Sequence, residues 1–195
     1  KFISSCINNG YSQDVANQGW ELIEPFADYS FNKSHAVEYA LLTYLTAYLK
    51  ANYPAEYMSA LLTSVKNKLE KAGPYISEAK KIGVQVKPVD INKSDVDFIP
   101  EEMSINFALS AIRNVGTEIA QLIVDERNAN GPYTNFYDFC HRVPISVLKN
   151  DVLASLIKAG AFDKFHPRKG LVLSYQSITE GLKTDKKKKA KGLIS

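Results

Sequence analysis

The first part of the chain places apolar residues at the three- and four-residue spacing of amphipathic helices. Ser12 is suited to cap a helix that continues to about residue 26. The strongest pattern covers residues 31–51, where alanine, leucine and tyrosine occupy nearly the whole circumference of the predicted helix. Because a helix that is apolar on all sides usually packs against several neighbours, we expect this segment to be buried.

Two further helices are predicted before the pattern changes. Pro54 favours the first turn of a helix over residues 54–67, where its missing N–H costs nothing. A shorter helix is expected to follow Pro74 and to stop at Gly83, since glycine is the usual residue just beyond a helix.

From residue 84 the apolar positions alternate instead. Alternation over residues 84–87, 95–98 and 105–109 predicts short strands. Helices are expected again near 117–129, 133–142, 144–159 and 168–183, and the lysine-rich stretch from residue 184 is typical of a flexible linker. The predicted fold is therefore mainly α. Helices occupy residues 1–83, a small β element (about 84–109) opens a helical domain over 84–183, and a basic linker covers 184–195.

Charge is unevenly distributed along the 195 residues. The chain has 24 Lys and Arg against 21 Asp and Glu, a net charge of +3. Residues 164–195 hold nine of the basic and two of the acidic residues, a net charge of +7, so the rest of the chain carries −4. A mildly acidic body with a basic tail differs from a uniformly basic protein that coats nucleic acid.

The composition also excludes several classes of protein. Cysteines only at positions 6 and 140 do not form a disulfide framework, and with three scattered histidines they do not form a structural zinc site. No apolar run approaches the ~20 residues of a membrane span, and residues 1–10 lack the apolar core of a signal peptide. We therefore expect no membrane association, no bound metal and a cytoplasmic location.

Residues 111–120, AIRNVGTEIA, have the pattern of a helix, a three-residue hairpin and a second helix. Gly116 is expected to take a positive φ at the corner. Asn114 occupies a position where such hairpins usually have another glycine, and asparagine is among the residues that tolerate the left-handed region. The unpaired N–H groups that begin the second helix suit a DNA phosphate. The candidate phosphate-binding residues are Arg113, Asn114, Val115, Gly116 and Thr117. An ordinary corner between two helices is the alternative.

A second candidate site opens the most apolar helix, at residues 31–36, FNKSHA. Lys33 and His35 lie in its first turn, where a cation opposes the helix dipole unless an anion such as a triphosphate is bound. A solvated surface is the alternative. Asp95 and Asp97 would share one face of a strand, as in a two-metal site. No third carboxylate is evident, so a surface turn over residues 90–95 is the preferred interpretation.

Five long segments, taken together and in order, resemble the alpha subunits of bacterial DNA polymerase III, the C family of replicative polymerases. They are FADYSFNKSHAVEYALLTYLTAYLKANYPAEYMSALLTS (26–64), VKPVDIN (86–92), FALSAIRNVGTEIAQLIVDER (107–127), YTNFYDFCHRV (133–143) and VLASLIKAGAFDKF (152–165). The resemblance reaches residue 183 and identifies the chain as the distal fingers and the helix-hairpin-helix domain of such an enzyme.

This resemblance implies a role for each candidate site. The fingers fold over the incoming deoxynucleotide, which makes Lys33, His35 and, one turn on, Tyr39 candidates to contact its triphosphate. The helix-hairpin-helix grips duplex primer-template DNA through the backbone. The family commonly has Gly-x-Gly in this hairpin, so Asn114 is a departure.

The resemblance also implies what this segment lacks. The catalytic carboxylates and their Mg²⁺ belong to a palm domain that no residue here matches, so we expect no cofactor in this segment and no nucleotidyl transfer by it alone. Residues 192–195, GLIS, look like the start of a peptide that binds the sliding clamp, one of the replisome subunits expected as partners. The alternatives are a stand-alone helix-hairpin-helix module of repair or recombination and a helical protein-interaction scaffold.

Overall fold

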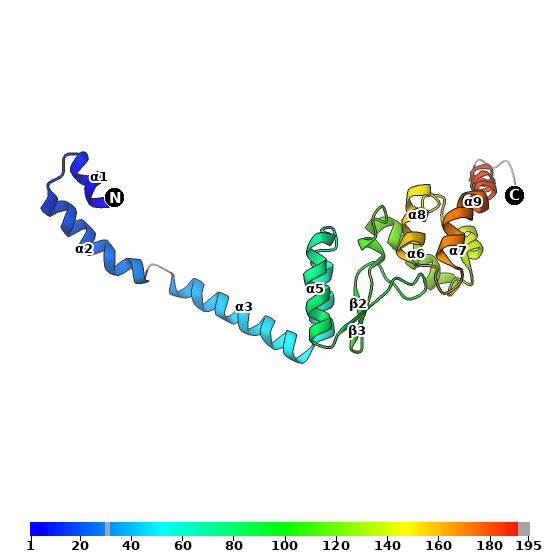
Figure 1. Ribbon diagram of the computed structural model, residues 1–195, viewed down its shortest axis with the longest axis horizontal. Coiled ribbons are helices and arrows are strands. Elements are labelled where there is room, and N and C mark those ends of the chain that lie inside the picture. The colour runs from blue at the N-terminus through cyan, green and yellow to red at the C-terminus, as the bar shows by residue number, and fades with distance from the viewer. Residues whose placement is uncertain (30–31, 191–195) are drawn as a thin grey trace. The chain divides into compact units, whose positions relative to one another are not determined.

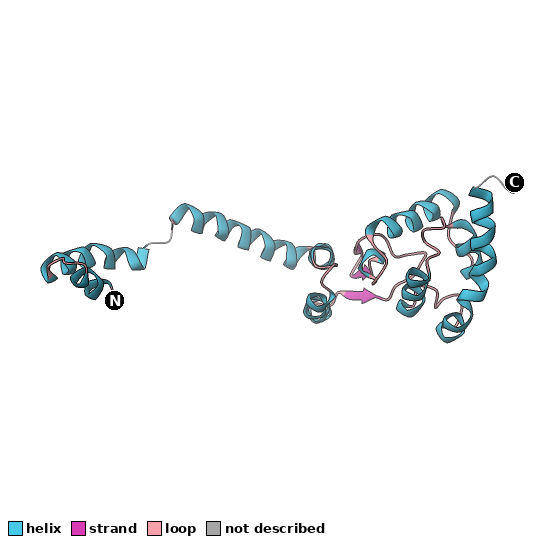
Figure 2. Ribbon diagram, turned by 90° about the horizontal axis from the view of Figure 1, so that it is seen from above, coloured by secondary structure: helices cyan, strands magenta, loops and turns pink. Residues whose placement is uncertain are grey.

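A computed structural model describes residues 1–29 and 32–190, and helices dominate these ranges (Figures 1 and 2). The elements are α1 (Phe2–Asn8), α2 (Gln13–Tyr29), α3 (Lys33–Asn52), α4 (Pro54–Ser64), α5 (Leu69–Lys81), β1 (Gln85–Lys87), β2 (Ile99–Glu101), β3 (Ser104–Asn106), η1 (Leu109–Ala111), α6 (Thr117–Asn130), α7 (Phe136–Arg142), α8 (Asn150–Ala159) and α9 (Arg168–Ala190). Many helices and a three-stranded sheet confirm the predicted fold class. The chain divides into two compact units, Lys1–Tyr48 and Leu49–Ser195.

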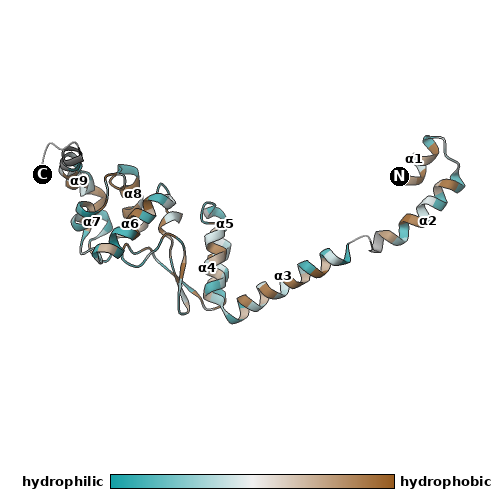
Figure 3. Cartoon of the chain, turned by 180° about the vertical axis from the view of Figure 1, so that it is seen from behind, coloured by the Kyte–Doolittle hydropathy of each residue, from teal (hydrophilic) through white to brown (hydrophobic). Residues whose placement is uncertain are grey.

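In the first unit, α1 packs on α2, with the rings of Phe2 and Trp20 5.8 Å apart. The Ser12 hydroxyl accepts the Val15 N–H at 3.3 Å, as expected of a capping residue. The expected burial of residues 31–51 is wrong, because no residue of α3 is buried and Leu41 is 58% exposed. Figure 3 shows apolar residues along this helix. A helix satisfies its own backbone hydrogen bonds, so the pattern predicts the helix without supplying its neighbours.

The second unit begins with α4 and α5 packed near a small sheet in the order β1-β3-β2. Strand β1 is parallel to β3, and β2 is antiparallel to it. Met58 and Leu62 of α4 are fully buried in one cluster with Phe98 and Ile105. Because these helices share a core with the sheet, residues 49–83 fold together with it. The boundary between compact units therefore does not coincide with the boundary expected at residue 83.

The largest differences from the predicted element boundaries occur at three places. Helix α5 begins five residues before Pro74, which lies inside the helix, and Gly83 follows its end with a φ of +84°. Residues 95–98 form no strand, and β2 begins at Ile99. The helix expected from residue 144 begins only at Asn150, since residues 144–148 form turns in which Leu148 N–H donates to the Ile145 carbonyl.

Helices α6 to α9 enclose the larger core, in which Phe136 and Phe139 each contact the ring of Phe162 at 5.0 Å. Helix α9 continues to Ala190, so residues 184–190 are helical where a flexible linker was expected. Lys186 Nζ in this stretch donates to the Val143 carbonyl. Residues 192–195, the expected start of a clamp-binding peptide, lie outside the described residues. No helix within the described ranges is long and apolar enough to cross a membrane.

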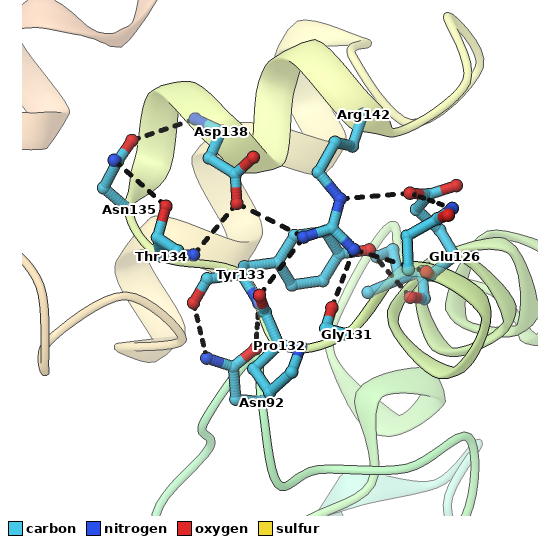
Figure 4. Close-up of polar contacts among 11 residues, drawn as sticks. Asn92, Glu126, Gly131, Pro132, Tyr133, Thr134, Asn135, Asp138 and Arg142 are labelled. Atoms are coloured by element: carbon cyan, nitrogen blue, oxygen red, sulfur yellow. Dashed lines mark hydrogen bonds and ion pairs between the residues drawn. The ribbon is translucent and has the colours of Figure 1, made fainter.

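Arg142 connects α7 to the loop that follows α6, as Figure 4 shows. Its guanidinium lies 4.6 Å from the centre of the Tyr133 ring. It donates hydrogen bonds to Glu126 Oε1 (3.0 Å), Asp138 Oδ2 (3.3 Å) and the carbonyl oxygens of Gly131 (2.7 Å), Pro132 (3.2 Å) and Glu126 (3.3 Å). Because one planar cation satisfies so many acceptors, it fixes the position of α7 relative to the end of α6.

Candidate nucleic-acid interface

The predicted hairpin is present between η1 and α6, although its first helix is a single 3₁₀ turn. Ile112 and Val115 are buried in the larger core, while Arg113 and Asn114 between them are exposed. The buried pair therefore anchors the turn, and the two polar residues face solvent.

The backbone conformation of this turn differs from the expected one. The positive φ, +65°, belongs to Asn114, whereas Gly116 has φ −69° and ψ 171°. The prediction that Gly116 is left-handed is therefore wrong. Gly116 is the extended N-cap of α6, a conformation that any residue adopts, and a Cβ added there would meet nothing within 4 Å.

Four amides at the start of α6 are available to a ligand. Val115 N–H already donates to the Ile112 carbonyl at 2.9 Å, so this amide is occupied, contrary to expectation. The N–H groups of residues 116–119 have no acceptor within the described part of the chain. Unpaired amides and the positive end of the helix dipole together favour an anion. Thr117 is exposed beside Gly116, and Glu118 is the acidic residue of this first turn.

A second arginine holds the turn over residues 90–95 against α6. Arg127 donates to the carbonyl oxygens of Ile91 at 3.0 Å and Ser94 at 2.7 Å, and its side chain is only 10% exposed. It also lies 3.8 Å from Asp95. Asp97 pairs instead with Lys66 at 2.5 Å. The predicted turn over residues 90–95 is present, since the N–H groups of Lys93 and Ser94 both donate to the Asp90 carbonyl. The carboxylates of Asp95 and Asp97 pair with different cations.

The other candidate site lies at the start of α3, in the first compact unit. Asn32 caps this helix through its Oδ1, which accepts the Ser34 N–H at 3.1 Å. Lys33 and His35 occupy the exposed first turn as expected, and no acidic residue shares that turn. The rings of His35 and Tyr39 meet edge to face at 4.4 Å. Phe31, which opened the predicted motif, lies outside the described residues.

Sequence reasoning did not identify Ser155 of α8, which lies beside the hairpin. Its Oγ is 3.2 Å from Asn114 Nδ2. The available signal is one polar residue within the apolar run of α8, between the buried Leu153 and Leu156. Nothing in that run indicates which of the distant residues is the partner.

Comparisons with known proteins agree with this geometry. Residues 83–171 match the family described as "Helix-hairpin-helix motif". The chain is 44% identical over 185 residues (94% of the chain) to DNA polymerase III subunit alpha of Mycobacterium tuberculosis strain H37Rv. It is 41% identical over 196 residues to the protein of this name from Chlamydia trachomatis serovar D, and 39% identical over 194 residues to that from Thermus aquaticus, both alignments covering 100% of the chain. The chain spans 16% of the length of these curated relatives. Over nearly its whole length it is therefore homologous to a segment of DNA polymerase III subunit alpha, and it contains a helix-hairpin-helix motif.

Proposed function

We propose that this chain forms part of a bacterial replicative DNA polymerase and that its hairpin holds the backbone of duplex primer-template DNA. The unpaired amides of residues 116–119, at the exposed start of α6, are the observation that carries the proposal. Amides that donate to phosphate oxygens do not distinguish one base sequence from another, which suits an enzyme that copies any template. The polymerase relatives favour this role over a stand-alone repair module.

Phosphate binding through amides explains how a net-acidic body can bind DNA. The residues before position 164 carry a net charge of −4, and Glu118 adds a negative charge near the hairpin. Donors fixed by the backbone need no positive surface, because the helix dipole supplies partial positive charge at the phosphate. The exposed Arg113 adds one full charge beside them.

The sharpest test removes one amide and leaves the helix intact. Thr117 is the first residue of α6, where proline is tolerated, and the extended conformation of Gly116 suits the residue before a proline. Thr117→Pro deletes an N–H that makes no bond within the described chain. Thr117→Ala is the matched control because it keeps the N–H.

We expect Thr117→Pro to bind a fluorescent duplex at least about tenfold more weakly than Thr117→Ala, since a hydrogen bond to a charged group contributes about 1.5–3 kcal/mol. The measurement is fluorescence anisotropy at low and moderate salt, with circular dichroism to verify the fold. Equal affinities for the two variants would exclude the amide of residue 117 as a phosphate donor. A folded wild-type chain that binds no duplex at low salt would refute the binding role itself.

We also propose that the start of α3 contacts the triphosphate of the incoming deoxynucleotide. Lys33 and His35, at the N-terminal end of an exposed helix whose first turn has no acid, suit a triphosphate, and Tyr39 supports the His35 ring. In a full-length polymerase that contains this segment, Lys33→Ala should raise the KM for deoxynucleotides or lower kcat more than it weakens primer-template binding. Lys50→Ala, in the last turn of α3, is the control. Loss of DNA affinity alone would refute the triphosphate role.

Template-directed synthesis itself would need further parts of such an enzyme. Mg²⁺ on palm carboxylates would supply the nucleotidyl-transfer chemistry, and Asp95 and Asp97 do not fit that role because each pairs with a cation of this chain. We therefore expect no primer extension by this chain alone. A sliding clamp and other replisome subunits would be partners of the whole enzyme, which would act in the cytoplasm.

A second candidate role is contact with protein. The exposed apolar residues of α3, such as Tyr44 and Leu45, favour it, because large apolar patches on a surface usually mark an interface. Light scattering of the chain over a range of concentrations tests whether a second copy of the chain binds this surface. A mass that stays at 21.7 kDa throughout would show that this surface does not drive self-association.

A further inference from the structure

The geometry points to Ser155 as a positioning residue for the duplex-binding hairpin, acting through Asn114 and not by touching DNA. This inference rests on the proposed function of the hairpin. Asn114 and Ser155 are 41 positions apart, and their side chains meet where Asn114 Nδ2 donates to Ser155 Oγ at 3.2 Å.

Asn114 occupies a conformation that residues with a side chain rarely adopt. Its φ is +65°, where the Cβ lies close to the backbone, although asparagine tolerates this better than most residues. The residue is also exposed, so its side chain has little packing to hold it there. A glycine would take this φ freely but would have no side chain to anchor the turn. The bond to Ser155 is therefore the contact that holds the Asn114 side chain.

Ser155 is a suitable anchor because α8 is rigidly packed. Its neighbours Leu153, Leu156 and Ile157 are at most 1% exposed, and they lie in the same core cluster as Ile112 and Val115 of the hairpin. The serine itself is only partly exposed. Its hydroxyl thus gives the exposed tip of the turn a partner on a helix that cannot move independently.

The position of Asn114 matters because the phosphate donors follow it directly. The Val115 N–H bond to Ile112 closes the turn, and the free amides of Gly116 and Thr117 come next. A rotation at residue 114 would move these donors together. Anchoring Asn114 therefore keeps the amides in the geometry that a phosphate requires, without any contact between Ser155 and DNA.

A double-mutant cycle in the whole chain tests this inference. The four proteins are wild type, Ser155→Ala, Asn114→Gly and the double variant. Ser174→Ala is the matched control, because the Ser174 hydroxyl on α9 donates within its own helix, to the Gly170 carbonyl, and the residue is partly exposed like Ser155. Two quantities are measured: the Kd for a labelled duplex, and the hydrogen-exchange rate of the Val115 amide without DNA.

We expect Ser155→Ala to weaken duplex binding about two- to tenfold and to speed exchange at Val115, as loss of one hydrogen bond would. The thermal midpoint should stay at the wild-type value, since the lost bond is exposed and its opening is local. In the Asn114→Gly background, Ser155→Ala should change neither quantity, because that background has already lost the amide that donates to Ser155. Ser174→Ala should match wild type.

Three results distinguish a failure of the positioning role of Ser155 from a failure of duplex binding by the hairpin. If Ser155→Ala matches wild type in both quantities, the inference is overturned. If Ser155→Ala weakens binding equally in the wild-type and Asn114→Gly backgrounds, Ser155 contacts DNA directly, and the positioning role is also overturned. If the wild-type chain binds no duplex, the proposed function fails, while the exchange rate of Val115 still decides whether Ser155 positions the hairpin.

Discussion

Replacing Arg142 with methionine should destabilise the helical domain more than any exposed charge substitution. The arginine side chain is 15% exposed, and its partners Glu126 and Asp138 are 21% and 27% exposed. Methionine keeps part of the apolar stem but leaves the Glu126 and Asp138 carboxylates without their shared cation, and the Gly131 carbonyl loses its donor as well. The pKa of the Asp138 carboxyl, held low by the Thr134 backbone N–H and by Arg142, should rise in the variant.

The size of the effect follows from this partial burial. Removing one partner of a buried ion pair costs about 3–5 kcal/mol, because the remaining charge has lost its compensation. The partners of Arg142 are about a quarter exposed, so water can replace part of the lost interaction. We therefore expect a loss of about 2–4 kcal/mol in the free energy of unfolding.

Urea unfolding measures this loss when it is followed by the NMR signals of Phe136 and Phe139, which lie in the affected core. Arg168→Met is the control. Arg168 pairs with Asp163 but is 49% exposed, so its loss should cost under about 1 kcal/mol. The two variants should have equal slopes of unfolding free energy against urea concentration. If Arg142→Met is then no more destabilising than Arg168→Met, the reasoning about the Arg142 network is refuted.

Three further predictions concern the hairpin, a thiol and a turn. Arg113→Ala should reduce the slope of log K against log salt concentration for duplex binding by about 0.9, because it removes one charge that contacts phosphate. Gly116→Val should weaken binding at an unchanged slope, because it adds bulk beside the amides and removes no charge. Anisotropy titrations over a series of salt concentrations measure both slopes, and a changed slope in Gly116→Val would contradict this reasoning. Burial raises the pKa of the Cys140 thiol from 9.0 to about 12, so the folded state holds its proton where the unfolded state loses it. Wild-type stability should therefore fall more steeply above pH 9 than that of Cys140→Ala in urea unfolding, and parallel curves would disprove the shift. Gly160→Ala should lower the free energy of unfolding by about 1–2 kcal/mol in the same assay, because φ is +91° there and a Cβ would meet the Arg168 side chain. The control is Gly170→Ala, where a Cβ would meet nothing within 4 Å, and it should leave the free energy of unfolding unchanged.

Features determined by neighbouring residues could be predicted from the sequence. The cap at Ser12 and the proline that opens α4 are correct because each depends on hydrogen bonds within one turn. The hairpin was located for the same reason. Its sequence marks both Asn114 and Gly116 as residues that tolerate a positive φ, and only Asn114 adopts one. Which of the two does so depends on how Ile112 and Val115 enter the core.

Features determined by distant contacts could not be predicted. Residues 95–98 alternate like a strand, yet Asp97 pairs with Lys66 in the turn after α4, and Asp95 lies near Arg127 of α6. The alternation therefore reflects contacts with these two segments and not pairing with a strand. The apolar residues of α3 predict a helix that packs against other segments, but they do not identify those segments, and no residue of α3 is buried. The contact between Asn114 and Ser155 spans 41 positions, and no local pattern connects them.

The extension of α9 changes how far its lysine-rich end can reach. Seven residues, 184–190, span about 10 Å as a helix, against about 24 Å as an extended strand. These residues therefore act as a short strut and not as a tether. Lys186, whose Nζ donates to the Val143 carbonyl, ties that strut to the end of α7.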